Sequence, residues 1–302
     1  MTTAFAILVR LGFWLVAAPL LPGLINKVKA WMAGRRGPPV LQLYYDLAKL
    51  WRKGTVLSSA ASVAHVAGPA VAWIALAGAT LLVPLGRGGA TLAFRGDALL
   101  FVYLLALARF AIALAALDTG SAFEGMGAAR EVSYAVLAEA AIITALLALG
   151  LQSHSISLSQ MLAPSAGAGA ALLAEGLFTV LLVENCRVPF DDPNTHLELT
   201  MIHEVMVLDH SGPTLATILH GAALKLLLFA VLLAEAVLPI GELPPLAASA
   251  TLIGAVLAVA VGVGLVESLL ARAAFRRVPL LLTTAFLLCL FALLLAWKGG
   301  GA

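Results

Sequence analysis

Charged residues are scarce in this sequence. Asp, Glu, Lys and Arg make up 11% of its 302 residues, against about 25% in an average soluble domain. A soluble protein of this length must cover its core with polar surface, and this chain has too little polar surface to do so. With a mean hydropathy of +1.04, the composition excludes an ordinary soluble domain and indicates a membrane protein.

Cysteines and short catalytic motifs are also scarce. Cys186 and Cys289 are the only cysteines, so the chain alone cannot build an iron–sulfur cluster, a structural zinc site or a disulfide framework. His203-Glu204 begins like HExxH, but the next histidine, His210, comes too late for that metal motif. There is no GxSxG, no P-loop lysine and no basic–aromatic nucleic-acid surface. We therefore expect no catalytic residue, metal or cofactor in this chain, and no nucleic-acid partner.

Long apolar runs fill most of the chain. They are about 20 residues long and rich in Leu, Ala and Val, which fits membrane-spanning helices and not the short alternating strands of a membrane barrel. The sequence predicts an all-α, polytopic membrane protein, with residues 1–302 forming a single transmembrane domain. About eight spans are predicted, at 3–25, 64–86, 98–117, 132–151, 165–184, 213–238, 247–270 and 279–297.

The connections between the spans differ in positive charge. Most of the lysines and arginines lie in four of them, at 26–63, 118–131, 185–212 and 271–278. Because positively charged connections stay on the cytoplasmic side of a membrane, these four are predicted to be cytoplasmic loops. The same rule places both termini outside.

The first of these loops contains an amphipathic pattern. Residues 40–51 (VLQLYYDLAKLW) place Leu43, Leu47, Leu50 and Trp51 on one helical face. Asp46 and Lys49 lie on other faces. The pattern predicts an amphipathic helix in the cytoplasmic interface of the membrane.

The most polar stretch of the chain lies between two apolar runs, at 184–212 (ENCRVPFDDPNTHLELTMIHEVMVLDHSG). It concentrates carboxylates, histidines and an arginine, and each of these must stay solvated or paired beside a membrane. Pro189 and Pro193 break a helix and predict a rigid elbow, after which 196–208 can form a short helix. The stretch favours a hydrogen-bonded docking surface or a proton-entry network over a metal site.

Several ionisable residues interrupt the apolar runs themselves. A charge at the centre of a bilayer costs about 3 kcal/mol on insertion scales, so such a group usually faces a protein interior, a partner or water. There it can bind and release protons near neutral pH. The alternative is a structural ion pair or a side chain that reaches the interface, which suits Glu267 and Arg10. The candidates for a proton path are Glu139, Glu175, Glu184, Glu235 and Lys225.

Three motifs in this order resemble one family. ENCRVPFDDP (184–193) is similar to the E-N-R-x-P-F-D motif of the membrane subunit of respiratory complex I that holds the quinone chamber, the H-type subunit or subunit 1. The continuation THLELTMIHEVMVLDHSGP (195–213) instead resembles the homologous subunit of membrane-bound group 4 [NiFe]-hydrogenases, including formate hydrogenlyase and hydrogenase-4 complexes. Residues 41–54 and 114–141 are similar to the family's first two cytoplasmic segments.

The resemblance implies a membrane anchor subunit without a redox centre of its own. Its expected partners are a [NiFe]-hydrogenase large subunit and an iron–sulfur small subunit at the cytoplasmic loops, antiporter-like membrane subunits and the lipid bilayer. Its expected location is the cytoplasmic (inner) membrane of a bacterium or archaeon. It would couple electron transfer to proton or sodium movement. The residues that match the partner-docking loops are Arg187, Asp191, Asp192, His196, Glu198, His203, Glu204, Asp118, Glu124, Arg130 and Glu131.

Two other functions remain open. One is the quinone-chamber subunit of a complex I-like NADH or ferredoxin dehydrogenase, which the 191–204 sequence disfavours. The other is a stand-alone secondary transporter, which would predict internal repeats around a mid-membrane site. No repeat is obvious in the sequence.

Overall fold

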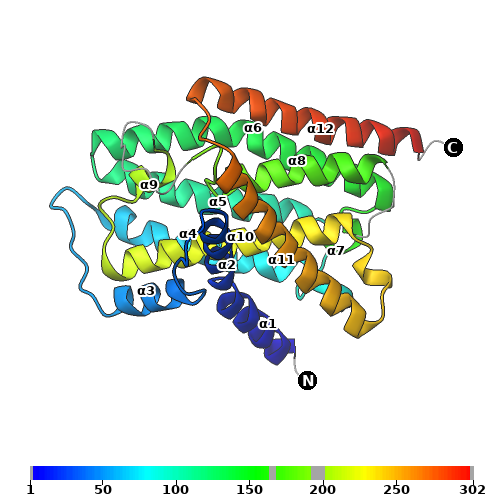
Figure 1. Ribbon diagram of the computed structural model, residues 1–302, viewed down its shortest axis with the longest axis horizontal. Coiled ribbons are helices and arrows are strands. Elements are labelled where there is room, and N and C mark those ends of the chain that lie inside the picture. The colour runs from blue at the N-terminus through cyan, green and yellow to red at the C-terminus, as the bar shows by residue number, and fades with distance from the viewer. Residues whose placement is uncertain (1–2, 163–167, 192–200, 300–302) are drawn as a thin grey trace.

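The computed structural model describes residues 3–162, 168–191 and 201–299, and all regular structure in these residues is helical (Figure 1). Helices run through the whole described chain. They are α1 (Thr3–Ala17), α2 (Leu20–Met32), α3 (Gln42–Trp51), α4 (Val63–Leu82), α5 (Asp97–Asp118), α6 (Ala122–Ser153), α7 (Leu158–Met161), α8 (Ala168–Glu184), α9 (His203–Met206), α10 (Gly212–Val237), α11 (Pro245–Leu269) and α12 (Val278–Gly299), with the short turns η1 (Gly86–Gly88), η3 (Ile240–Glu242) and η4 (Phe275–Arg277).

Seven stretches of the described residues are long and apolar enough to cross a bilayer. The remaining predicted span, 165–184, falls on α8. The 17 residues of this helix extend about 26 Å at 1.5 Å per residue. A helix satisfies its own backbone hydrogen bonds, which the hydrocarbon layer requires of any spanning segment. The predicted all-helical, multi-pass membrane fold is confirmed.

The first span differs from its predicted bounds of 3–25. Helices α1 and α2 together form an apolar stretch, Phe5–Met32, that runs past residue 25. The helix is broken before α2, where Pro19 lacks a backbone N–H and cannot continue the α-helical pattern of α1. The part of α2 beyond residue 25 contains polar residues. One of them, Lys29, forms an ion pair with Glu267 of α11.

The predicted loop at 118–131 is mostly helix. Helix α6 begins at Ala122, so only a short turn separates it from α5. One of the glycines in this stretch, Gly127, has a packing role. A Cβ at this position would lie 2.4 Å from the Val205 side chain and 2.8 Å from the Ile202 carbonyl oxygen. Gly127 therefore lets the segment around α9 lie directly on α6.

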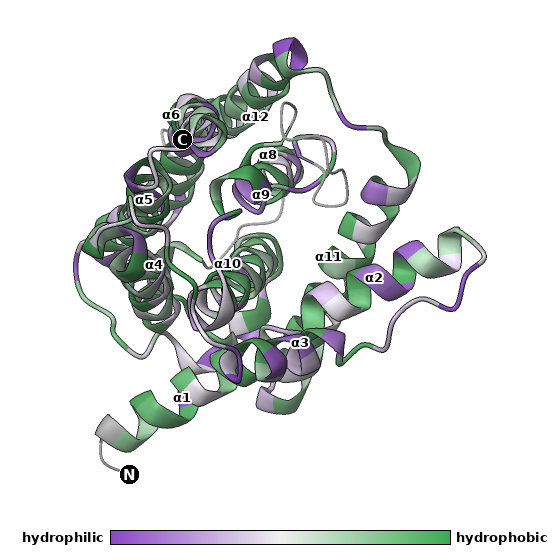
Figure 2. Cartoon of the chain, turned by 90° about the vertical axis from the view of Figure 1, so that its left-hand side faces the viewer, coloured by the Kyte–Doolittle hydropathy of each residue, from purple (hydrophilic) through white to green (hydrophobic). Residues whose placement is uncertain are grey.

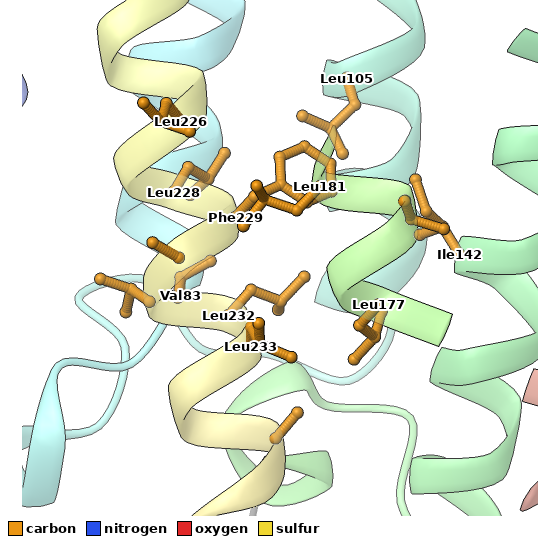
Figure 3. Close-up of a cluster of buried hydrophobic side chains, with 14 of the residues drawn as sticks. Val83, Leu105, Ile142, Leu177, Leu181, Leu226, Leu228, Phe229, Leu232 and Leu233 are labelled. Carbon is orange, nitrogen blue, oxygen red and sulfur yellow. The ribbon is translucent and has the colours of Figure 1, made fainter. Parts of the chain in front are cut away.

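Helix α10 is the central helix of the bundle. It packs against α4, α8, α11 and α3, and every residue from Leu226 to Ala236 is buried. Seen along the bundle, α4, α5, α6 and α12 form an outer row around α8 and α10 (Figure 2). Between them, Phe229 and Leu232 of α10 lie near Leu177 and Leu181 of α8 (Figure 3).

Helix α3 is amphipathic, as the sequence predicts. Leu47 is buried and Leu43 packs against the core, and Tyr45 is exposed. Trp51, predicted on the apolar face, is also exposed, at the last residue of the helix. The helix lies against α10 and α2. Helix α3, α9 and the start of α10 lie at the same end of the bundle, on the left in Figure 1. We call this the loop end, and the end with η1 and η3 the far end.

Candidate functional site

Arg109 on α5 is the centre of a buried ionic network. Its Nη1 contacts the carboxylate of Glu139 and its Nη2 contacts that of Glu184. Its Nε lies 3.7 Å from Oε1 of Glu131. Lys225 Nζ lies 2.7 Å from the other oxygen of Glu184. These five residues, called the Arg109 network below, join α5, α6, α8 and α10.

The residue types explain the geometry. A guanidinium carries five N–H donors in a planar fork, so Arg109 can bind several carboxylates at once, each at a different nitrogen. Glu131 and Glu139 are eight residues apart on α6, which places them on the same helical face. Glu184 ends α8 and receives the second cation, Lys225.

Burial makes this pairing necessary. The side chains of Arg109 and Glu184 are 7% and 2% exposed, and removing one partner of a buried ion pair leaves an uncompensated charge. With all groups ionised, the three carboxylates exceed the two cations by one negative charge. Glu139, at 36% side-chain exposure, is the network's most exposed carboxylate. The arrangement can therefore take up a proton at a carboxyl group without losing all of its ion pairs.

A second set of ion pairs fixes the elbow that follows Glu184. Glu267 on α11 accepts from Arg187 Nη1 at 3.2 Å and lies 2.7 Å from Lys29 Nζ. The structural pairing expected of Glu267 is present, with these two partners. Arg187, predicted to contact a partner protein, ties the elbow to α11 in this chain.

Asp191 and Arg130 organise the return of the chain toward α9. Asp191 Oδ2 accepts from the backbone N–H groups of Ile202 and His203, each at 3.0 Å. Arg130 donates to the carbonyl oxygen of Met201 at 2.9 Å. These two predicted docking residues thus shape the loop from inside.

Two arginines stack on the ring of Phe275 in this region. The guanidinium carbons of Arg130 and Arg272 lie 4.4 and 4.9 Å from the centroid of Phe275. Arg272 also lies 3.7 Å from Asp191. The connection between α11 and α12 is therefore joined to loop 185–212 by charge and by cation–π contact.

Two cavities lie near the loop and the network. A cavity of about 80 Å³ is lined by Arg109, Glu131, Glu184 and Lys225, and also by Asn185, Cys186 and His203. A second, of about 270 Å³, shares Asn185, Cys186 and His203 and adds Glu204. The predicted docking residue His203 therefore lines both cavities, and Glu204 lines the second.

Cys186 lines both cavities, and its surroundings disfavour a reactive thiol. Its Sγ is 3.8 Å from Oε2 of Glu131. Burial, with Glu131 next, raises the pKa of the thiol well above its ordinary value, which disfavours the thiolate needed for nucleophilic attack or metal binding. Among the described residues, no group of three His, Cys, Asp or Glu side chains could hold a metal ion.

The remaining predicted proton-path residues lie outside the network. Glu175 is exposed on α8, so the structure does not bring it to the ion pairs. Glu235 lies near the far end of α10 and accepts from the backbone N–H of Gly86 at 2.6 Å.

The predicted docking residues on α5 and α6 have local partners. Asp118 accepts from the backbone and the hydroxyl of Ser62. Glu124 is buried and accepts from Asp209 N at 3.1 Å. Glu131 belongs to the Arg109 network and not to a loop, because α6 begins nine residues before it. Asp192, His196 and Glu198 lie outside the described residues. The short helix predicted for 196–208 is helical only at His203–Met206 in the described part.

The site residues predicted from the sequence did not include Arg109, the centre of the Arg109 network. Arg109 interrupts an apolar span, and an arginine in that position requires carboxylate partners. That requirement could have identified it before the structure was known.

Comparisons with known proteins agree with this fold. The family model described as NADH dehydrogenase matches residues 5–298. Hydrogenase-4 component C of Escherichia coli (strain K12) is 33% identical over 236 residues, covering 76% of this chain and 73% of that protein. Formate hydrogenlyase subunit 4 of the same organism is 30% identical over 268 residues, covering 86% and 85%.

A solved structure shows the same arrangement of helices. It is the membrane-bound sulfane sulfur reductase, an archaeal respiratory membrane complex, one chain of which matches with a TM-score of 0.85 and 20% identity, covering 98% of this chain and 100% of that one. At this identity the match shows the fold alone. The motifs, the family match and the two relatives together establish that this chain belongs to the NADH dehydrogenase family of membrane subunits, as the resemblance of 184–193 predicted.

Proposed function

We propose that this chain is the non-catalytic membrane subunit of an energy-converting hydrogenase-type complex. In this proposal its loop end holds a [NiFe] large subunit and an iron–sulfur small subunit, and antiporter-like subunits lie beside it in the membrane. The relatives at 33% and 30% identity support this, since both are named as components of such complexes. The positive charge of the loop-end connections supports a cytoplasmic loop end and termini outside the inner membrane.

The Arg109 network is the observation that carries the coupling role. It is the place where carboxylates of two helices meet one guanidinium, and Glu184 in it is followed directly by Asn185 and the elbow. A charge change at the loop that shifts the elbow would move the Glu184 carboxylate relative to Arg109 and Lys225. Arg109 would then hold Glu131 and Glu139 more strongly, which favours proton release from them. Electron transfer near the loop could thereby change proton occupancy inside the membrane.

The lining of the cavity beside Arg109 supports proton transfer. The cavity has a volume of about 80 Å³ and is lined by Arg109, Glu131, Glu184 and Lys225. Water in this cavity would lie against carboxylates, and water beside a carboxylate network can carry protons.

Replacing Glu139 by Gln tests the coupling role. The amide keeps an oxygen acceptor for Arg109 but cannot exchange a proton at neutral pH. We expect the complex to assemble and to transfer electrons at a near-normal rate. The number of ions moved per electron pair in inverted vesicles should fall to less than about a tenth of the native value. Glu175→Gln, on the exposed face of α8, is the matched control and should couple normally. Full coupling in Glu139→Gln would remove the network from the mechanism.

Replacing Arg187 by Ala tests the docking role. The change leaves Glu267 with Lys29 alone and frees the elbow, so the loop should hold the soluble arm less firmly. Loss of a buried charged partner costs about 1–3 kcal/mol, which predicts roughly tenfold more arm released by a salt wash. The measurement is nickel retained per membrane subunit, with the exposed Arg276→Ala as control. Nickel-free partners with quinone reductase activity would instead support the complex I-like alternative.

A further inference from the structure

Two histidines form a buried pair at the loop end, apart from the Arg109 network. His65 lies in the first turn of α4, and His210 lies two residues before α10. Their rings stack with centroids 3.9 Å apart and an interplanar angle of 3°, and the residues are only 1% and 4% exposed. The stack joins the end of loop 185–212 directly to α4.

Further contacts fasten the residues on either side of His210. Asp209 N donates to Oε1 of Glu124 at 3.1 Å. The Ser211 hydroxyl accepts from Val56 N at 2.9 Å and donates to Val56 O at 3.2 Å. Asp209, His210 and Ser211, called the latch segment below, are thus held against α4, α6 and the connection before α4. All three elements meet at the left of Figure 1.

The charges around the pair are distributed unevenly. The carboxylates of Asp118 and Glu124 interact electrostatically with His65. Asp209, on the latch segment itself, is exposed and interacts with Glu124. His210, by contrast, faces the ring of His65, and within the described chain neither of its ring nitrogens has a hydrogen-bond partner.

This setting disfavours a proton on His210. Burial, and then the charge of the neighbouring His65, lower the pKa of His210 from 6.5 to about 4. With its ring stacked and both ring nitrogens unpartnered within the described chain, His210 is therefore proton-free at neutral pH.

We propose that His65 and His210 form a proton-binding site, separate from the Arg109 network, whose occupation releases the latch segment from α4. Two imidazolium rings 3.9 Å apart repel each other. A buried imidazolium without an acceptor is also costly, and the cost ends when the ring reaches water. Proton uptake at His210 therefore favours an open latch. The site would make the attachment of the loop end depend on the pH of the adjoining aqueous phase.

Linkage gives the sign and the size of the effect. The closed latch holds His210 with a pKa of about 4, and the open latch restores the ordinary 6.5. The open form binds more protons between these values, so opening grows as the pH falls from 6.5 toward 4. The open population should be about 30-fold larger at pH 5 than at pH 8.

Amide hydrogen exchange of the whole purified complex tests the proposal without any assay of coupling. The peptide that covers the latch segment is followed at pH 8 and pH 5, after correction for the intrinsic exchange rate. We expect the roughly 30-fold rise in opening in the native chain and less than about a threefold rise in His210→Phe, whose flat ring keeps the stack but binds no proton. His154→Asn, which removes an exposed histidine at the far end, should behave like the native chain.

Two results would overturn the proposal. One is an opening equilibrium that does not change with pH in the native chain. The other is an equal pH dependence in His210→Phe. If His210→Phe fails to assemble, His65→Phe replaces it, because that change removes the like charge while keeping a ring to stack on. Its pH dependence should be shallower than that of the native chain, and an unchanged dependence would again contradict the proposal.

Discussion

Glu184 and Glu235 are two buried carboxylates that differ in what holds them. Glu184, at the end of α8, contacts Arg109 and Lys225, which come from two other helices. Glu235, on α10, accepts from the backbone N–H of Gly86, and no ion pair of Glu235 occurs among the described residues. In the sequence, Glu184 begins the polar stretch 184–212, whereas Glu235 lies within an apolar run, and both were predicted to lie on a proton path.

The comparison shows that burial alone does not make a carboxylate part of a relay. The partners of Glu184 are themselves charged side chains, so moving one of them changes the charge balance of the whole set. The partner of Glu235 is a backbone group in η1, which cannot change its charge. Glu235 therefore closes a turn at the far end, while Glu184 can transmit an electrostatic change.

Removing Arg109 should have the largest effect. In Arg109→Gln, Glu131, Glu139 and Glu184 lose their shared cation in a buried setting, which costs about 3–5 kcal/mol of unfolding free energy. Thermal denaturation of the complex in detergent and the ion-to-electron ratio in vesicles should both fall sharply. Arg109→Lys keeps the charge but not the fork and should be intermediate. Native stability in Arg109→Gln would show that the ion pairs are not needed.

A double substitution sharpens the role of Glu184. Glu184→Gln leaves Arg109 and Lys225 with a neutral acceptor and should lower the unfolding free energy by about 2–3 kcal/mol. Adding Lys225→Gln removes the cation that Glu184→Gln leaves without a carboxylate partner, so the double variant should regain part of that stability, with a coupling energy of about 1 kcal/mol or more. Strictly additive losses in a double-mutant cycle would argue against a direct pair.

Glu235→Gln should have the smallest effect. The amide oxygen still accepts from Gly86 N, so we expect less than about 1 kcal/mol of change in stability and unchanged coupling. The same denaturation and vesicle measurements apply. A loss of coupling in this variant, with stability intact, would show that Glu235 takes part in proton transfer and does not differ from Glu184 in this respect.

The overall fold follows from the sequence because a bilayer allows few structures. Span length, interruption by charge and the 3.6-residue period of 40–51 predict the helices and the interfacial α3. The bounds of α6 did not follow, because its glycines look like a loop until Val205 is seen packed on Gly127.

The rotation of each helix was the part that the sequence could not supply. Helix α8 is apolar on all sides, so nothing in its sequence distinguishes the exposed Glu175 from the buried end at Glu184. In a membrane, both lipid and protein surroundings accept the same apolar residues. Only the packing against α6, α10 and α12 determines which carboxylate meets a cation.

Helix α6 contains both the glycine that contacts the segment around α9 and two of the carboxylates that contact Arg109. Gly127 seats the segment around α9, and Glu131 and Glu139 contact Arg109 farther along the same helix. Twelve residues of helix separate Gly127 from Glu139, about 18 Å at 1.5 Å per residue. A partner protein that displaced α9 would therefore move the carboxylates that contact Arg109 through a single continuous helix.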